Sequence, residues 1–373
     1  MIANGPGSTL NAGRTAIEVL IVDDSAVVRQ KLKSIIETDP RFRVTLAADP
    51  YEAVKCLKKS APGVIVLDVE MPGMDGLTFL KKLMSQHPLP VVLCTNVADR
   101  AVTALEIGAL EVISKPDWRD PAKMTGWSAN FLESVRNAVR AGRVPLRDDK
   151  VASLDSKHTA DAVLPKYAYV ARTGVTDPVI VVGGSTGAVQ ALPRLLCGFP
   201  KDCPGIVIVQ HMPPPFTNAL AARLNNDPNI AIEVAEAKNL EPIRPGRALV
   251  IPADLHGLVR RTGVGYRVEL QEGPLVCRHR PSVEVLFRST AQAAGPNAAG
   301  VIMTGMGDDG ARGLLEMREA GATTFAQDEA TSVVFGMPKE AIRLGAAMFV
   351  QPLDRLASSV MNWVASNETG TRR

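Results

Sequence analysis

The sequence has no long apolar run, no leader-like start and no paired cysteines. No stretch of its 373 residues approaches the roughly 18 to 20 consecutive apolar residues that a membrane-spanning helix needs. The opening residues, MIANGPGSTLNAGRTA, lack the apolar core of a signal peptide. The five cysteines are odd in number and follow no metal-binding spacing. We therefore expect a soluble, cytoplasmic protein with reduced thiols and no membrane insertion.

A strong charge of one sign is also missing. The 42 Lys and Arg residues nearly balance the 39 Asp and Glu residues, and the basic side chains are scattered along the chain. Neither a basic face nor a helix-turn-helix pattern is present, which excludes a DNA-binding regulator and predicts no nucleic-acid partner. The hydrophobic share of 46% is that of an ordinary globular protein, and the length is enough for two domains.

What the sequence does contain is an alternation of short apolar runs with helical patterns, which predicts a parallel α/β architecture. In the first part, EVLIVDD, GVIVLDV, PVVLCT and EVISKP read as buried strands. In the second part, RALVIPA, HGLVRR and YRVEL suggest a small antiparallel patch within a doubly wound, mainly parallel domain, because RTGVG is typical of a hairpin. Between the two parts, residues 142–177 mix charges and small residues without a sustained period, as linkers do.

Acidic residues mark strand ends in the first part. Asp23 and Asp24 end one predicted strand, Asp68 ends another, and Thr95 and Lys115 follow two more. Because the carboxyl ends of parallel strands meet at one edge of a sheet, we expect these side chains to lie together. Three carboxylates favour a hard divalent cation, Mg²⁺ above all. A lysine and a hydroxyl nearby suit a phosphoryl group carried by one of the carboxylates.

With these residues in VDDSAVVR, LDVEMPGMDG and SKP, the segment from about 18 to 140 resembles a response-regulator receiver domain. The resemblance implies a flavodoxin-like, five-stranded parallel sheet and a phosphorylation that depends on Mg²⁺. It implies that Asp68 accepts the phosphoryl group and that Asp23, Asp24 and Asp68 bind Mg²⁺. It also implies that Thr95 and Lys115 contact the phosphoryl group. Val112 departs from the pattern, because receivers often carry Tyr or Phe three residues before this lysine.

The second part begins with a Gly-rich bend, GGSTG at residues 183–187, that allows two interpretations. The bend either cradles a phosphate or presents Ser185 as a nucleophile in a G-x-S-x-G elbow. The dinucleotide fingerprint fits worse, because it needs glycine where Ser185 stands and an acidic residue where His211 ends the next strand. A receiver fused to a non-hydrolytic, nucleotide-binding output domain is therefore the alternative to a hydrolase.

His211 and an aspartate pair supply partners for such a nucleophile. His211 follows the strand after that of Ser185, and Asp308 and Asp309 follow the strand AGVIM. A carboxylate beside His211 would fix its tautomer and stabilise the imidazolium that forms when it takes the serine proton. The chain order Ser, His, Asp differs from that of α/β-hydrolases, so that fold is not implied.

From about residue 18 to residue 365 the chain resembles the bacterial chemotaxis protein-glutamate methylesterases. The motifs are VVGGSTGA, VQHMPPPF, HRPSVEVLF, VIMTGMGDDGARG and VVFGMPKEA. The resemblance implies that Ser185 is the nucleophile and His211 the general base. Since the third strand-end motif of the family reads G-M-G-x-D-G, the catalytic aspartate is Asp309. Thr186 and Met306 occupy neighbouring motif positions and are candidate oxyanion contacts.

The same resemblance implies hydrolysis of glutamate methyl esters on methyl-accepting chemoreceptors and deamidation of receptor glutamines. It also implies a chemotaxis histidine kinase as phosphodonor, and no cofactor for the esterase reaction. We further expect the receiver to cover the Ser185 cleft until Asp68 is phosphorylated. We expect an N-terminal extension at residues 1–17, a receiver domain at 18–141 and a linker at 142–177. The methylesterase domain follows at 178–367, and residues 368–373 form a tail.

Overall fold

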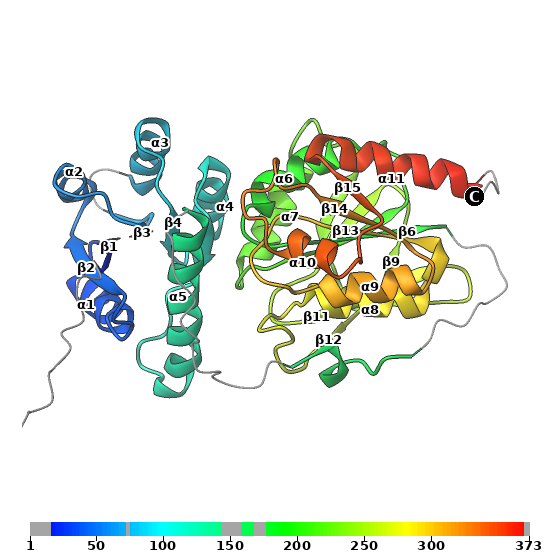
Figure 1. Ribbon diagram of the computed structural model, residues 1–373, viewed down its shortest axis with the longest axis horizontal. Coiled ribbons are helices and arrows are strands. Elements are labelled where there is room, and N and C mark those ends of the chain that lie inside the picture. Colours follow the sequence, from blue (N-terminus) through cyan, green and yellow to red (C-terminus); the bar gives the residue numbers. More distant parts are fainter. Residues whose placement is uncertain (1–15, 72–74, 143–157, 168–176, 369–373) are drawn as a thin grey trace, which may run out of the picture.

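The computed structural model describes residues 16–71, 75–142, 158–167 and 177–368. Figure 1 shows two units side by side, each built on a parallel sheet covered by helices. We call them the N-terminal unit, residues 16–142, and the C-terminal unit, residues 177–368. Within the described ranges, none of the helices combines the length and the apolar character needed to cross a bilayer.

The N-terminal unit has a five-stranded parallel sheet in the order β2-β1-β3-β4-β5, as the resemblance to receivers predicts. Its strands are β1 (Ile17–Val22), β2 (Phe42–Ala47), β3 (Val64–Leu67), β4 (Val91–Cys94) and β5 (Glu111–Ile113). Its helices are α1 (Ala26–Ile36), α2 (Pro50–Leu57), α3 (Gly76–Gln86), α4 (Ala98–Ile107) and α5 (Pro121–Ala141). Apolar side chains of α1 and α5 pack on one face of the sheet, and those of α3 and α4 pack on the other.

One strand of this sheet, β2, is not among those that the sequence patterns predict. It lies at the sheet edge, where its side chains alternate between buried and exposed positions, as at Phe42, Arg43 and Val44. A continuous apolar run marks only strands that are covered on both faces, such as β3 and β4. The edge strand therefore lacks the pattern by which its neighbours are found.

The C-terminal unit has a seven-stranded parallel sheet in the order β15-β14-β13-β6-β7-β10-β8. Its strands are β6 (Val179–Gly184), β7 (Gly205–Gln210), β8 (Glu233–Glu236), β10 (Arg247–Val250), β13 (Ala298–Ile302), β14 (Thr323–Gln327) and β15 (Phe349–Gln351). Its helices are α6 (Ala188–Leu196), α7 (Phe216–Asn225), α8 (Val283–Ala293), α9 (Ala311–Glu319), α10 (Met337–Arg343) and α11 (Leu353–Glu368). A short 3₁₀ helix, η2 (Gly295–Asn297), precedes β13.

A small antiparallel sheet completes this unit, in the order β11-β12-β9. Its strands are β9 (Glu241–Ile243), β11 (His256–Arg261) and β12 (Tyr266–Gln271). The hairpin predicted at RTGVG joins β11 to β12 and is confirmed. The expectation that RALVIPA joins the antiparallel patch is wrong, because β10 pairs in parallel with β7 and β8. Its buried residues Ala248, Leu249 and Val250 are typical of a strand covered on both faces.

Part of the predicted linker lies against the C-terminal unit. Residues 158–167 contain a 3₁₀ helix, η1 (Ala160–Ala162), and are described, whereas 143–157 and 168–176 lie outside the described residues. Ala160 and Leu164 are buried in an apolar cluster with residues of α8 and β11. Within the predicted linker, residues 158–167 are thus a structured segment docked on the second unit.

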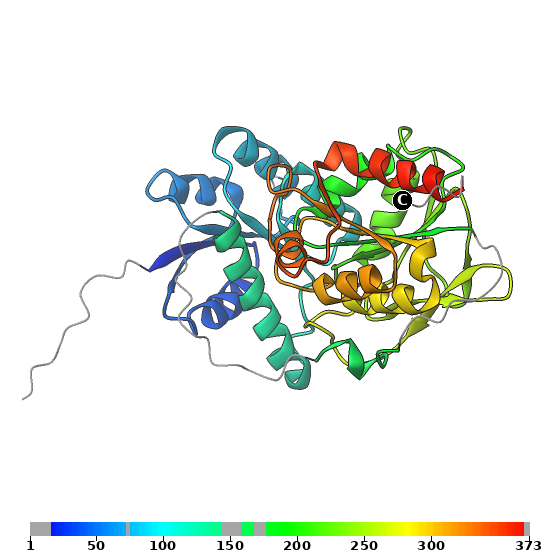
Figure 2. The same cartoon turned by 45° about the vertical axis from the view of Figure 1, so that its right-hand side comes forward.

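The two units meet through α4 of the first and α6 and α7 of the second (Figures 1 and 2). A continuous cluster of buried apolar side chains extends across this boundary. The side-chain amide of Gln190 on α6 donates hydrogen bonds to the carbonyls of Leu105 and Ala109, and the Ser114 hydroxyl donates to the Pro214 carbonyl at 3.0 Å. The contact brings the β5 edge of the N-terminal unit to the carboxyl ends of β6 and β7.

Candidate active site

Three adjacent strands of the C-terminal sheet bring the predicted triad to one edge. β6 lies between β13 and β7, and all three run in parallel. Ser185 follows β6, His211 follows β7, and Asp309 lies on the turn after β13. The strand that precedes Ser185 is therefore flanked by those that precede His211 and Asp309, so the three side chains gather at one sheet edge.

The bend at Ser185 depends on small residues. Gly187 has a φ of 85°, a left-handed conformation that favours glycine, and α6 starts at the next residue. Gly305, on the neighbouring turn, lies so close that a Cβ atom there would be 2.8 Å from Cβ of Ser185. The glycines of both motifs thus allow the strand-end turns to approach each other at the serine.

His211 and Asp309 are joined by a hydrogen bond. The distance between His211 Nε2 and Asp309 Oδ2 is 2.8 Å, and the Asp309 residue is only 1% exposed. Although burial raises the pKa of Asp309, the hydrogen bond and charge of His211, the charge of His279 and the hydroxyl of Ser282 lower it to about 2. The carboxylate is therefore ionised at neutral pH, and Nε2 of a neutral His211 carries the proton that faces it.

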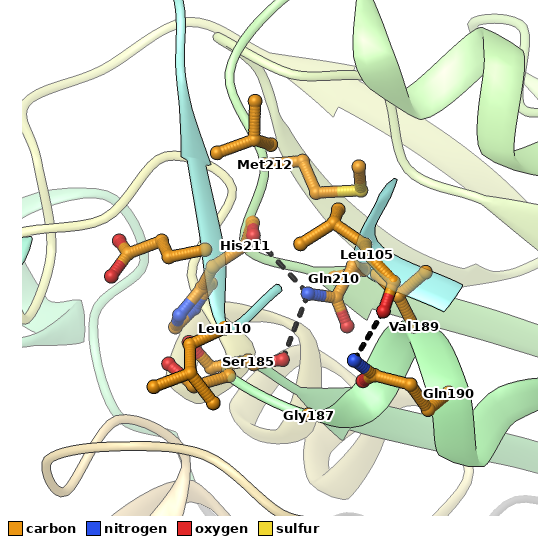
Figure 3. Close-up of a pocket in the computed structure, with 12 residues that line it drawn as sticks. Leu105, Leu110, Ser185, Gly187, Val189, Gln190, Gln210, His211 and Met212 are labelled. Atoms are coloured by element: carbon orange, nitrogen blue, oxygen red, sulfur yellow. Dashed lines mark hydrogen bonds between the residues drawn. The ribbon is translucent and has the colours of Figure 1, made fainter. Parts of the chain in front are cut away.

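The other ring nitrogen of His211, Nδ1, is not part of this hydrogen bond. Within the described residues His211 Nδ1 is buried without a hydrogen-bond partner. Ser185 lines the same pocket, but among those residues no hydrogen bond joins its hydroxyl to His211 (Figure 3). Contacts of this kind are often long in unliganded enzymes and tighten on the substrate. The structure thus connects two members of the predicted triad and leaves the third beside them.

The pocket at Ser185 is small. Its volume is about 20 Å³, which is room for little more than one water molecule. Residues of the N-terminal unit form part of its wall: Leu105, Leu110, Glu111 and Val112. Figure 3 shows Leu105 next to Gln190, whose amide bonds its carbonyl. Residues of both units thus line the pocket beside Ser185.

Sequence reasoning gave no role to several residues at the site. The Gln210 amide, which is 2% exposed, donates to the carbonyls of Ser185 at 3.0 Å and His211 at 3.2 Å. The ring of His279 stacks on that of His211 with centroids 3.7 Å apart. Ser282 donates a hydrogen bond to Asp309. All three occur in the quoted motifs VQHMPPPF and HRPSVEVLF or directly beside them, and that adjacency is the only signal in the sequence.

The remaining candidates lie at different distances from the pocket. Thr186 is 8% exposed and lines the pocket with Ser185. Met306 is half-buried on the turn after β13 and is not among the lining residues. The Asp308 side chain is exposed, whereas that of Asp309 is buried against His211. Of the two aspartates, only Asp309 has the position that a triad requires.

The predicted phosphorylation site lies at the carboxyl edge of the N-terminal sheet. Lys115 Nζ lies 2.6 Å from Asp68 Oδ2 and 2.8 Å from Asp23 Oδ2. Burial raises the pKa of Asp68. Burial lowers the pKa of Lys115, but the hydrogen bonds to Asp23 and Asp68 outweigh it, and the pKa is raised. Thr95, fully buried, accepts a hydrogen bond from the Val97 amide.

The same edge has the donor set of a divalent cation site. Carboxylate oxygens of Asp23, Asp24 and Asp68 lie within 4.8 Å of one another, and Asp24 is exposed while the other two are buried. Oxygen ligands on one side and an open approach on the other fit Mg²⁺, which keeps several waters when it binds to protein. The residues present therefore fit the metal that the receiver resemblance implies.

Comparisons with known proteins agree with this arrangement. A family model described as CheB methylesterase matches residues 180–360, and one described as response regulator receiver domain matches residues 19–124. A protein-glutamate methylesterase/protein-glutamine glutaminase of Anaeromyxobacter dehalogenans is 52% identical over 96% of this chain and 98% of its own length. One from Geobacter metallireducens is 50% identical over 92% of this chain and 98% of its own length.

Among solved structures, the crystal structure of the Thermotoga maritima CheB methylesterase catalytic domain is 34% identical, with a TM-score of 0.49. The match covers 50% of this chain and 99% of the Thermotoga chain. The matches of the sequence to the methylesterase family leave the nucleotide-binding alternative without support.

Proposed function

The chain belongs to the CheB methylesterase family, and we propose that Ser185, His211 and Asp309 carry out its reaction. It is a phosphorylation-regulated hydrolase that removes methyl esters from glutamate side chains and deamidates glutamine side chains. The observation that carries the assignment is the 2.8 Å hydrogen bond between His211 and buried Asp309, next to the turn that holds Ser185.

The reaction is acyl transfer through the serine. His211 Nδ1 accepts the proton of the Ser185 hydroxyl while the serine oxygen attacks the ester carbonyl. The C–O bond to the methoxy group breaks, and the protonated imidazole returns the proton so that methanol leaves. A water molecule then attacks the acyl-enzyme with His211 again as base, which releases glutamate and restores the serine. With a glutamine side chain the same steps release ammonia in place of methanol.

The start of α6 supports the charged intermediate. Its N-terminal amides follow Ser185 directly, and the partial positive charge of a helix N-terminus favours the oxygen anion that forms during attack. Thr186 lines the pocket and is the nearer of the two candidate oxyanion contacts; Met306 lies on the adjacent turn.

The receiver site controls access to this chemistry. We propose that Asp68 accepts the phosphoryl group, with Asp23, Asp24 and Asp68 as ligands of Mg²⁺ and with Thr95 and Lys115 in contact with the phosphoryl oxygens. The metal would neutralise charge on the transferred group. Lys115 bridges Asp68 and Asp23, so a phosphoryl group on Asp68 rearranges this ion pair at the end of β5. Because β5 borders the Ser185 pocket, such a change reaches the interface between the units.

The proposed partners follow from membership of the methylesterase family. The substrates are methyl-accepting chemoreceptors, and the phosphodonor is a chemotaxis histidine kinase. The protein acts in the cytoplasm, with its five cysteines as free thiols in the described part of the chain. Each event adds one negative charge to a receptor, which can shift a two-state signalling equilibrium.

Methanol release from methylated receptor tests the assignment. In the full chain, activated with a small phosphodonor, Ser185→Ala should lower the rate by at least about 10³-fold, because the attacking atom is removed. Ser289→Ala, which removes another serine hydroxyl in the same unit, should leave turnover nearly unchanged. Substantial methanol release by the Ser185 variant would overturn the proposal.

A further inference from the structure

We propose that Ser282 is a positioning residue for the esterase reaction, whose hydroxyl holds the Asp309 carboxylate in the orientation that His211 requires. The inference rests on the triad proposed above and adds a fourth side chain to it. Ser282 lies directly before α8 and is fully buried, so it does not contact the substrate. Its effect on the reaction therefore acts through Asp309.

Asp309 is held by four hydrogen-bond donors. Its Oδ1 accepts from the Ser282 hydroxyl at 2.7 Å and from the Glu284 amide at 3.0 Å. Its Oδ2 accepts from the Val283 amide at 2.8 Å and from His211 Nε2 at 2.8 Å. An ionised carboxylate offers about four lone-pair sites, so all of them are used. Three of the four donors belong to the start of α8, and this set fixes the plane of the carboxylate.

Ser282 is the only side-chain donor among the three from α8, and the direction of its proton is determined. The Ser282 oxygen accepts a hydrogen bond from the Glu284 amide at 3.1 Å and a long one from the Val285 amide at 3.5 Å. The Glu284 amide has one proton, which it shares between the Ser282 oxygen and Asp309 Oδ1. Because these amides face the Ser282 oxygen as donors, the single proton of the hydroxyl points to Asp309. A hydrogen bond to an ionised carboxylate is stronger than one between neutral groups. Loss of the hydroxyl thus affects the charge as well as the position of Asp309.

A second buried histidine, His256, holds the backbone of Ser282 through a hydrogen bond. The backbone amide of Ser282 donates to His256 Nδ1 at 3.3 Å, and the opposite nitrogen, Nε2, donates to the Pro274 carbonyl at 2.9 Å. Burial lowers the pKa of His256, which favours the neutral ring that this pair of contacts requires. The contacts continue from β11 through Ser282 to Asp309 and His211. We infer that His256 holds Ser282 where its hydroxyl can donate to the Asp309 carboxylate.

A purely structural role has to be separated from this one, because Ser282 is also the N-cap of α8. Glycine costs a helix N-cap only a few tenths of a kcal/mol, whereas alanine costs more. Ser282→Gly therefore keeps most of the helix start and removes the donor to Asp309. Ser282→Thr keeps the hydroxyl. Ser289→Ala is the matched control, since Ser289 is buried on the same helix but bonds the Leu286 carbonyl and the Val259 amide.

The experiment is methanol release by the full, phosphodonor-activated chain as a function of pH. We expect Ser282→Ala and Ser282→Gly to lower kcat/KM by about 10- to 100-fold, the effect of one lost hydrogen bond to a charged group. Their activity should also fall at a higher pH on the acid side than that of the wild type, because a carboxylate that has lost one donor stabilises the protonated form of its imidazole partner more strongly. Ser282→Thr should recover most of the rate, and Ser289→Ala should match the wild type in rate and pH profile.

Other ionisable groups face Asp309 and stay constant across the set of variants: His211, His256, His279, Cys277 and Glu284. A Ser282→Gly variant with the wild-type rate and pH profile would overturn the inference, and so would a folded threonine variant no better than the glycine variant. If Ser282→Ala does not fold, as judged by circular dichroism, the glycine variant decides. Turnover retained by Ser185→Ala would instead overturn the proposed triad, so the two failures are distinguishable.

Discussion

Asp309 and Glu284 are neighbouring buried carboxyl groups whose pKa values move in opposite directions. The pKa of Asp309 is lowered to about 2 by its donors. That of Glu284 is raised to about 7, first by burial and then by the charge of Asp309. Glu284 is 2% exposed, and the Cys277 thiol lies 3.6 Å from its carboxylate. The donors that keep Asp309 charged thus favour a neutral neighbour on the same helix end.

Glu284→Gln should flatten the pH dependence of stability around neutrality. Because folding raises the pKa of Glu284 from 4.5 to about 7, its neutral form stabilises the native state fully below the ordinary value, and this contribution is lost as the pH rises through about 7. The thermal midpoint of the wild type should therefore fall between about pH 4.5 and about pH 7.5, and that of the variant should fall less.

The control is Glu269→Gln, which alters a partly exposed carboxylate paired with Arg260 at 3.0 Å on the antiparallel sheet. This variant should keep the pH dependence of the wild type. An identical pH dependence of the thermal midpoint in the Glu284 variant and the wild type would show that this carboxyl does not titrate near neutrality.

The sequence predicts the three residues of the proposed triad but not the residues that hold Asp309. Ser185, His211 and Asp309 stand at strand ends within Gly-rich motifs, and strand ends are readable from apolar runs. Ser282 and Glu284 resemble an ordinary N-cap and first-turn acid of a helix. Their proximity to Asp309 depends on how the start of α8 meets the turn after β13, which is a long-range contact that no local pattern encodes.

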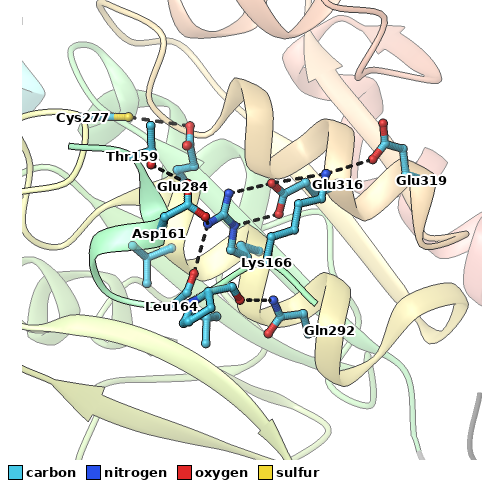
Figure 4. A network of polar contacts seen from close by, with 12 residues as sticks. Thr159, Asp161, Leu164, Lys166, Cys277, Glu284, Gln292, Glu316 and Glu319 are labelled. Atoms are coloured by element: carbon cyan, nitrogen blue, oxygen red, sulfur yellow. Dashed lines mark hydrogen bonds and ion pairs between the residues drawn. The ribbon is translucent and has the colours of Figure 1, made fainter. Parts of the chain in front are cut away.

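The docked segment 158–167 is another feature whose position the sequence does not predict. Figure 4 shows it running past α8 and α9, which carry Glu284 and Glu316. Arg288 on α8 joins three partners there. The guanidinium of Arg288 binds both carboxylate oxygens of Glu316 at 2.8 Å, Asp161 at 2.8 Å and the Leu164 carbonyl at 3.0 Å. Lys166 lies 3.5 Å from Glu319. The composition of residues 142–177 is that of a linker, and the polar anchor inside it depends on an arginine more than a hundred residues away.

Arg288→Met should destabilise the protein far more than Asp161→Asn. The Arg288 side chain is 5% exposed and that of Glu316 11%, so removal of the cation leaves a buried carboxylate unpaired, at a cost of about 3 kcal/mol in the free energy of unfolding. Asp161 is 61% exposed, and loss of its charge should cost under about 1 kcal/mol. Denaturant titration of the two variants measures the difference. Equal losses would contradict the idea that the buried Arg288–Glu316 pair anchors the segment.

Which strands are predictable depends on how they are covered. The central strands β6, β7 and β13 are buried along their whole length and appear as continuous apolar runs. The short strands β8, β9 and β15 carry exposed or half-buried side chains and are not found by the same criterion. The hairpin of β11 and β12 is predictable because its turn has its own sequence preference.

In the whole molecule, the N-terminal unit narrows the Ser185 pocket by forming part of its wall. α4 and β5 supply the covering residues, and Val112, 4% exposed, stands among them where many receivers carry an aromatic residue. Arg223 on α7 also pairs with Glu106 on α4 at 2.6 Å, but this pair is largely exposed and contributes little. The contact between the units rests chiefly on the shared apolar cluster and the Gln190 contacts. Two domains are predictable from length and motifs, whereas these interface residues are not.

Removal of the receiver should raise the basal activity. A fragment that begins at residue 158 retains the docked segment, and its Ser185 pocket is no longer covered. Its methanol release should exceed that of the unphosphorylated full chain by about 5- to 100-fold, the usual range of coupling between sites. As a control, the Asp68→Asn full chain should stay at the basal rate when a phosphodonor is added. Equal rates for the fragment and the unphosphorylated full chain would refute occlusion.

The central claim is that one hydroxyl, that of Ser185, attacks the ester with His211 as its base. Reaction of the phosphodonor-activated full chain with a fluorophosphonate, followed by peptide mass spectrometry, tests it most directly, because the reagent labels only an activated serine. The account predicts loss of esterase activity in step with a single label on Ser185, and little labelling in a His211→Gln variant. Inactivation with the label on another residue, or an unlabelled Ser185 in the inactivated enzyme, would contradict it.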